Sequence, residues 1–349
     1  MTLPLPVDYP PMEAKLVGAL PEGAQWQYEP KWDGFRCLAF RDGDTVDLRS
    51  KSGQPFNRYF PEIVAAVGAL GARKAVLDGE IVVPVGDVLA FDDSGNALWN
   101  AKVGSEVIAP PRVAEGVALV FSGDGRLYAL STKDGATRWV YQRANPPLVV
   151  RNHAGAVIVR GAVFFGTAGG RLVGLDLRTG AVGWEVLVAT PKGATELERI
   201  ADVTSLPAID DRMACASAYQ GRTACFELVR GTTVWSRDIG SLGGVAIDSR
   251  HLYVTDDAGA VHALDRSTGA SVWKQDKLAK RFPGGPQLVG DQVGVVDAEG
   301  WLHLLSRENG AYVGRVATDG SAPTSQPVAT IGGALWQSTA GALVAVRVR

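Results

Sequence analysis

Apolar and polar positions recur along most of this chain with a period of about 40 residues. Each unit has a short strand of alternating apolar and polar residues, a tight turn around Gly, and a second strand that ends in Trp, except that the last unit has Gly314 in place of Trp. The units lie at residues 88-99, 127-139, 172-184, 224-235, 261-273 and 302-314. Trp99, Trp139, Trp184, Trp235 and Trp273 are 40, 45, 51 and 38 residues apart. This period is the length of one four-stranded blade, so it predicts a mainly β fold, a multi-bladed β-propeller.

The number of blades follows from the number of units. We expect five complete units between Ala101 and about Thr318, an incomplete blade before them, and an unfinished blade at 325-348. Residues 85-349 thus hold six to seven blade equivalents. The tryptophans are expected to pack where neighbouring blades meet. Because an open ring exposes strand edges, the missing strands threaten closure.

Residues 1-84 do not follow this period. They begin with Pro-rich coil and contain one candidate amphipathic helix at 61-72 and short strands around 35-43, 44-53 and 74-84. This pattern predicts a separate, truncated α+β domain. One hypothesis joins the two parts: the strand from Ile81 to Val83 replaces a blade strand, so that the junction folds as a propeller hairpin.

Composition and charge argue against several classes of function. The formal net charge is -2, with 9 basic and 11 acidic residues up to Pro84 and 26 of each after it. Neither part has the basic excess of a nucleic-acid-binding surface. No run reaches the roughly 18 apolar residues of a transmembrane segment, and the N-terminal residues do not resemble a signal peptide. As the sequence is written, we therefore expect a cytoplasmic location.

Cysteines and histidines offer little sign of a metal site. Cys215 and Cys225 lie ten residues apart. They could form a disulfide across a hairpin, but two small buried thiols are the expectation. The four histidines have no metal-ligand spacing and are expected to be structural. They are His153, His251, His262 and His303.

The segment EPKWDGFRCLAFRDGD, residues 29-44, resembles motif I of the ATP-dependent DNA ligases. The resemblance implies that Lys31 is the nucleophile that attacks the α-phosphate of ATP, as a lysine with a lowered pKa can do. Further matches are LRSKSG at 48-53, RYFPEI at 58-63 and VLDGEIVVP at 76-84. By the same resemblance the ATP-binding residues are Glu29, Arg36, Arg49 and Glu80.

The later ligase motifs are not found after Pro84. Without the aromatic residue that stacks on adenine, the metal-binding carboxylate and the further lysines, the site should lose most of its rate. We therefore expect Lys31 to be vestigial, with ATP and Mg²⁺ needed only if the fragment is active.

The rest of the chain resembles another family. PPLVVRNHAGAVIVRG at 146-161, the long insertion GATELERIADVTSLP at 193-207, and GAVHALDRSTGASVWKQDKL at 259-278 resemble the BamB family. The resemblance implies an eight-bladed lipoprotein propeller at the periplasmic face of the outer membrane. It also implies a non-enzymatic role without a cofactor: binding the periplasmic domains of BamA and assisting insertion of β-barrel proteins.

The same resemblance carries the partner-binding positions of that family to Leu148, Val150, Arg151 and Asp202. Val150 replaces a leucine of the family pattern, and Thr204 stands where a second acidic residue can occur. An Arg beside exposed aliphatic residues suits a binding hot spot. In the alternative interpretation, Arg151 and Asp202 only hold neighbouring blades together.

Three interpretations of the whole chain remain. In the favoured one it is a chimera whose propeller is a non-enzymatic, BamA-binding scaffold. In the second it is a nucleotidyltransferase that forms a lysyl-AMP at Lys31. In the third it is a fusion with neither activity. A quinone-dependent dehydrogenase is disfavoured because the chain has neither adjacent cysteines nor an obvious cluster of carboxylates for calcium.

Overall fold

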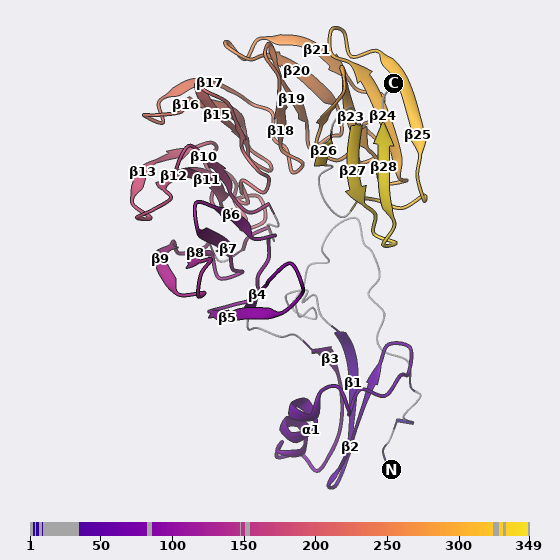
Figure 1. Cartoon of the computed structure of the whole chain (residues 1–349). Helices are drawn as coiled ribbons and strands as arrows, with labels where there is room; N and C mark the ends of the chain where they lie inside the picture. Colours follow the sequence, from indigo (N-terminus) through magenta and orange to yellow (C-terminus); the bar gives the residue numbers. More distant parts are fainter. Residues whose placement is uncertain are drawn as a thin grey trace. The chain divides into compact units, whose positions relative to one another are not determined.

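The computed structural model describes residues 3, 5, 6, 9, 35–81, 86–146, 148–150, 154–323, 328–330 and 333–347. The chain divides into two compact units, Met1–Pro84 and Val85–Arg349. Each unit is described by itself (Figure 1).

The first unit contains a three-stranded antiparallel sheet in the order β2-β1-β3. Its elements are β1 (Phe35–Asp42), β2 (Thr45–Ser50), α1 (Pro61–Gly68) and β3 (Lys74–Ile81). The expected helix is present but ends at Gly68. Cys37, Ala39 and Leu48 share one face of the sheet and form a small core with Val67 of the helix. No helix among the described residues has the length and apolarity of a membrane-spanning segment.

The hypothesis of a strand shared at the junction is wrong for Ile81. Ile81 pairs with Phe35 of β1, so β3 belongs to the sheet of the first unit. The next strand, β4 (Gly86–Phe91), pairs instead with β5 (Ala97–Val103). Val82 and Val83 lie outside the described residues.

The second unit is a succession of antiparallel sheets. Within the described part of the chain, five sheets have four strands each, in simple sequence order, and correspond to the five complete units expected from the Trp period. β4 and β5 form a two-stranded sheet before them, and β26, β27 and β28 a three-stranded sheet after them. In Figure 1 the sheets follow one another from β4–β5 to β26–β28.

The strands of the first three complete sheets are β6 (Arg112–Ala114), β7 (Val117–Phe121), β8 (Arg126–Ser131), β9 (Thr137–Gln142), β10 (Val157–Val159), β11 (Ala162–Thr167), β12 (Arg171–Asp176), β13 (Val182–Leu187), β14 (Ala208–Ile209), β15 (Met213–Ser217), β16 (Thr223–Glu227) and β17 (Thr233–Arg237). The remaining strands are β18 (Val245–Ile247), β19 (His251–Thr255), β20 (Val261–Asp265), β21 (Ser271–Gln275), β22 (Gln287–Val289), β23 (Gln292–Val296), β24 (Trp301–Ser306), β25 (Tyr312–Ala317), β26 (Val328–Thr330), β27 (Gly333–Gln337) and β28 (Leu343–Arg347).

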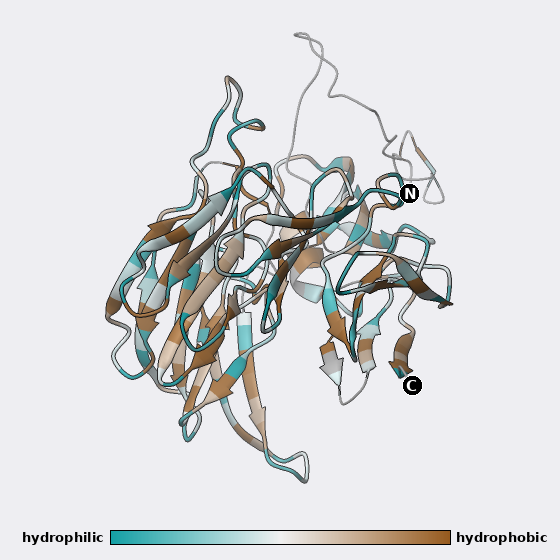
Figure 2. Cartoon of the chain, turned by 90° about the horizontal axis from the view of Figure 1, so that it is seen from above, coloured by the Kyte–Doolittle hydropathy of each residue, from teal (hydrophilic) through white to brown (hydrophobic). Residues whose placement is uncertain are grey.

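Burial differs between the strands of a sheet in a regular way. The second and third strands are almost entirely buried, as in β15 and β20, because both of their faces pack against neighbouring sheets. The fourth strands, such as β9, alternate between exposed and half-buried positions. In Figure 2 the hydrophobic residues follow the strands, whereas many of the connecting turns are hydrophilic. First strands of consecutive sheets lie next to each other, as β18 and β22 do.

One repeated contact joins the consecutive sheets from β4–β5 to β22–β25. The indole N–H of the Trp on the last strand of a sheet donates a hydrogen bond to a backbone carbonyl in the turn between the third and fourth strands of the following sheet. We call this contact the Trp clamp. The pairs are Trp99 to Thr132, Trp139 to Leu177, Trp184 to Leu228, Trp235 to Arg266 and Trp273 to Arg307, at 2.8 to 2.9 Å.

Each Trp ring also lies on a glycine of that turn. These glycines have φ between +67° and +71°, a left-handed conformation that favours Gly. A Cβ atom on any of them would lie 2.5 to 2.9 Å from the indole. They are Gly135, Gly180, Gly231, Gly269 and Gly310.

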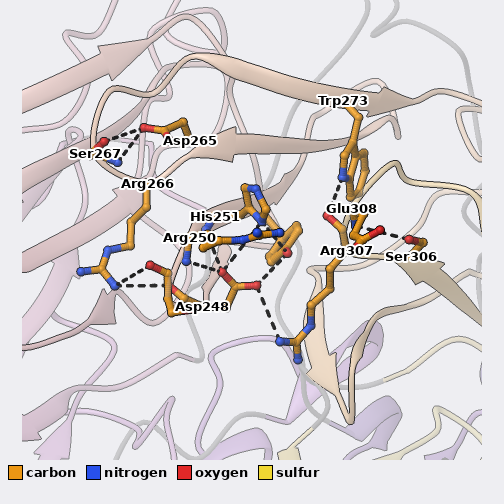
Figure 3. A network of polar contacts seen from close by, with 12 residues as sticks. Asp248, Arg250, His251, Asp265, Arg266, Ser267, Trp273, Ser306, Arg307 and Glu308 are labelled. Carbon is orange, nitrogen blue, oxygen red and sulfur yellow. Dashed lines mark hydrogen bonds and ion pairs between the residues drawn. The ribbon is translucent and has the colours of Figure 1, made fainter.

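Charged side chains add a second contact beside two of the Trp clamps. Figure 3 shows the one at Trp273, where Arg307 approaches Asp248. Nη2 of Arg266 lies 3.1 Å from Oδ2 of Asp210 in the preceding sheet, and Nη1 of Arg307 lies 3.6 Å from Oδ2 of Asp248. Burial would raise the pKa of Asp248, but hydrogen bonds from backbone amides and from the Tyr253 hydroxyl lower it below its usual value. An ionised Asp248 therefore faces Arg307 across the sheet boundary.

The expectation of two free thiols at Cys215 and Cys225 is wrong. These residues are direct cross-strand partners in β15 and β16, with their Cα atoms 4.1 Å apart, and they form a disulfide. Cys37 is a free, buried thiol. Sequence spacing alone does not distinguish a cross-strand pair from two cysteines on opposite faces, because a shift of one residue in the register reverses the face.

The Trp clamp predicts unequal effects for one substitution at two equivalent turns. Gly269→Ala should lower the free energy of unfolding by about 1–3 kcal/mol more than Gly95→Ala. Both glycines have positive φ, but Gly269 lies against Trp235 whereas nothing lies within 4 Å of a Cβ on Gly95. Urea unfolding of the two variants measures the difference. Equal losses would show that the ring contact contributes nothing and that only the backbone conformation matters.

Candidate functional site

The partner-binding positions expected from the sequence lie in loops between sheets. Leu148 and Val150 belong to the loop between β9 and β10, and Asp202 to the loop between β13 and β14. In an antiparallel sheet of four strands, these loops and the turns between second and third strands lie at one end. The Trp clamps occupy the other end. We call the end with these loops the loop end and the end with the clamps the Trp end.

Asp202 is buried, with 3% of its surface exposed. Its carboxylate accepts hydrogen bonds from the backbone N–H groups of Val150, at 2.6 Å, and Gly169, at 2.8 Å. Burial raises the pKa of Asp202, while the two amide hydrogen bonds act in the opposite direction. The carboxylate thus joins the loop before β10 to the turn after β11, a positioning role rather than an exposed contact.

Leu148 and Val150 differ in solvent exposure. The Leu148 side chain is 39% exposed, whereas Val150 is half-buried and held through its amide by Asp202. Arg151 lies outside the described residues. The structure therefore brings Val150 and Asp202 into contact, with an exposed leucine two residues away in the same loop.

A pocket of about 200 Å³ lies beside these residues. Its wall includes Phe121, Arg143 and Val203 in addition to Val150 and Asp202. Phe121 and Arg143 lie in ordinary repeat positions and were not expected from the sequence. Their only signal is their place at the loop end, where Phe121 ends β7 and Arg143 directly follows β9. Nη1 of Arg143 pairs with Oε1 of Glu185 at 2.5 Å.

Thr204 extends this site toward the next sheet. Its hydroxyl donates a hydrogen bond to the carbonyl of Leu242, at 3.0 Å. The carbonyl of Asp202 accepts a hydrogen bond from the amide of Tyr219, at 2.8 Å. The insertion between β13 and β14 is thus fixed to loops on both sides of it, and the loop end forms a connected surface.

Among the ligase-like positions, Glu29 and Lys31 lie outside the described residues. Glu80 is the cross-strand neighbour of Arg36 in β1 and β3. Nε of Arg36 lies 2.7 Å from Oδ1 of Asp78. These side chains belong to the sheet face opposite Cys37 and Ala39.

Arg49 is the third of the described candidates. Its guanidinium pairs with its neighbour Asp47 at 2.8 Å, so the nearest anion to it is a side chain of its own strand. No group of three metal-ligating side chains occurs among the residues that the structure describes.

The described histidines have structural partners. Nε2 of His262 lies 2.8 Å from Asp256, and Nε2 of His303 lies 2.8 Å from Asp297. In both cases the His and Asp flank a turn between the second and third strands of a sheet. His251 is buried. His153 lies outside the described residues.

The positioning role of Asp202 can be measured. Asp202→Ala should lower the free energy of unfolding by about 1–3 kcal/mol because it leaves the amides of Val150 and Gly169 without their acceptor. Amide hydrogen exchange at these two residues should become faster. Asp211→Ala is the control, because Asp211 forms only an exposed ion pair with Arg160. Unchanged stability with both amides still protected would contradict the role.

Comparisons with known proteins agree with this architecture. The family model for the outer membrane protein assembly factor BamB, a PQQ-repeat model, matches residues 34–275. The BamB protein of Nitrosomonas eutropha is 44% identical over 83% of this chain and 71% of its own length. The BamB protein of Bordetella pertussis is 41% identical over 82% of this chain and 73% of its own length.

A solved structure gives the same result. The crystal structure of BamB from Moraxella catarrhalis matches with a TM-score of 0.71 and 26% identity, covering 77% of this chain and 80% of that one. The matched range of the family model begins inside the ligase-like segment and contains Arg36, Arg49 and Glu80. These matches give no support to a DNA ligase fragment or to a chimera. The chain belongs to the family of the outer membrane protein assembly factor BamB.

Proposed function

We propose that this chain is a non-catalytic propeller scaffold in the assembly of outer membrane proteins, and that the periplasmic domains of BamA dock on its loop end. Family membership supports the assembly role. The observation that supports the docking site is the arrangement around Asp202. A buried carboxylate fixes the backbone of Val150, and Leu148 in the same loop is exposed.

The residues of this site have two different roles in binding. A leucine on a fixed loop can enter a partner's pocket with little loss of conformational freedom, which is the condition for a hot spot. Asp202 acts indirectly, by fixing the position of the loop that carries Leu148 and Val150. Arg151 is proposed as the charged contact beside Leu148. Neither role requires a metal or a cofactor.

The cytoplasmic location expected from the N-terminal residues contradicts the family, whose members are outer membrane protein assembly factors. We propose a periplasmic location at the outer membrane instead. The disulfide between Cys215 and Cys225 supports this proposal because disulfides persist in the oxidising periplasm and are rare in the cytosol.

The docking proposal predicts a selective loss of affinity. Leu148→Ala should weaken binding of the periplasmic domains of BamA by about tenfold, and Arg151→Glu by at least as much. Leu98→Ala is the matched control, since Leu98 is also exposed but is the second residue of β5, at the Trp end. Biolayer interferometry with immobilised BamA domains measures the affinities. Full affinity in both loop variants would exclude this docking site.

Adenylation is the second candidate function, and no observation on the described residues favours it. Arg36 and Arg49 are both paired with aspartates of the same sheet. We therefore predict that incubation with α-³²P-labelled ATP and Mg²⁺ leaves the chain unlabelled. Acid-labile label that disappears in Lys31→Ala would contradict this prediction and establish an adenylated lysine.

A further inference from the structure

A second pocket lies at the loop end, two sheets further along the chain from the pocket beside Asp202. It has a volume of about 450 Å³. Its wall comes from the loop before β18, the turn between β19 and β20, and the loop before β22. A pocket of this volume accommodates side chains of a partner. This pocket is separate from the proposed docking site for BamA.

Its floor depends on two glycine-containing loops that touch. A Cβ atom on Gly243 would lie 2.5 Å from the backbone nitrogen of Gly285 and 2.7 Å from its Cα. Any side chain at Gly243 would therefore push the loop before β18 away from the loop before β22. This close approach holds the two loops together beside the pocket.

The rim of the pocket is apolar and faces solvent. Leu242 is 51% exposed and Phe282 is 79% exposed. Phe282 also has a φ of +50°, a left-handed conformation that is uncommon for a bulky residue. An aromatic side chain held outward at the mouth of a pocket is an exposed apolar surface suited to a partner.

One wall carries two carboxylates. Asp256 and Asp257 are adjacent, and the lining contains no Lys or Arg. The Asp257 carboxylate accepts hydrogen bonds from the amides of Gln220, at 2.9 Å, and Leu242, at 3.1 Å. Asp256 lies 2.8 Å from His262. Both carboxylates are therefore fixed in place, and a cation brought by a ligand would meet a preformed partner.

An unpartnered polar atom is the second, independent sign of a ligand. Thr255 lines the pocket and is 3% exposed, and its hydroxyl oxygen has no hydrogen-bond partner among the described residues. Leaving a buried hydroxyl without a partner costs about 1–3 kcal/mol. A ligand that reaches into the pocket could supply the missing hydrogen bond.

We propose that this pocket binds an extended segment of a protein partner in which a large apolar side chain is followed by Lys or Arg. The apolar side chain covers Leu242 and Phe282, the basic side chain approaches Asp256 and Asp257, and a polar group of the segment meets the Thr255 hydroxyl. A small molecule filling the pocket would leave the outward rim uncovered. The inference rests on the proposed scaffold role.

This pocket continues the surface that carries the first site. The Thr204 hydroxyl is bonded to the carbonyl of Leu242, so the insertion that carries Asp202 also supports the rim of the second pocket. One extended partner could thus contact both. The two sites are nonetheless separate in their residues, and each can be tested alone.

The test uses the full chain and a short, capped Gly-Ser peptide with one central Phe-Lys pair. Saturable shifts are expected in two-dimensional amide NMR spectra at Gly243, Asp257 and Gly285. Matched peptides with Phe-Glu or Ala-Lys should bind at least about tenfold more weakly. Equal binding of the Phe-Glu peptide, or shifts only at other residues, would overturn the proposal.

Three variants separate binding from folding. Phe282→Ser should weaken binding of the Phe-Lys peptide by about tenfold. Thr255→Val should also weaken it, without loss of stability, because the hydroxyl it removes has no partner among the described residues. Val229→Ser is the control, since Val229 is as exposed as Phe282 but lies in a turn at the Trp end. Unchanged affinity in Phe282→Ser and Thr255→Val would overturn the proposal, whatever the Leu148 variants do with BamA.

Discussion

The Trp clamp is the contact on which the propeller depends. A single β-sheet of four strands has two apolar faces and cannot bury either of them alone, so each sheet needs its neighbours. The clamp fixes that packing in one geometry: an indole N–H bonded to a carbonyl of the next sheet and a ring seated on a glycine with positive φ. Five such contacts join the sheets from β4–β5 to β22–β25.

Because of this arrangement, the two ends of each sheet have different roles. The Trp end is committed to holding sheets together, with the ion pairs of Arg266 and Arg307 beside the indoles. The loop end is free to vary in length, as the insertion between β13 and β14 shows. Exposed leucine and phenylalanine side chains on fixed loops are therefore found where they do not disturb the clamp. Both proposed docking sites lie there.

Much of the fold was predictable from the sequence because the repeat is local. The Trp period, the alternating strands and the turn glycines predicted five complete units, and five four-stranded sheets are present. Cross-strand register was not predictable, which is why the disulfide of Cys215 and Cys225 and the pairing of Ile81 with Phe35 were missed. The burial of Asp202 was also hidden, because its two hydrogen-bond donors are backbone amides that are distant in sequence.

The ligase assignment of residues 1-84 was wrong for a different reason. A few matches to a catalytic family suggested ATP chemistry for residues 1-84, whereas the family model of the propeller begins at residue 34. Chemistry depends on positioned groups acting together, and the described candidates Arg36 and Arg49 are paired with aspartates of their own sheet. Resemblance of motifs without a completed site is weak support for an activity.

The central claim is that a partner docks on the loop end of the propeller. Hydrogen–deuterium exchange of the full chain, with and without the periplasmic domains of BamA, tests it most directly. The account predicts new protection in the loop that carries Leu148 and Val150 and in the neighbouring insertion, with the turns of the Trp clamps unchanged. Protection confined to those turns, or no protection at the loop end under conditions of saturated binding, would contradict it.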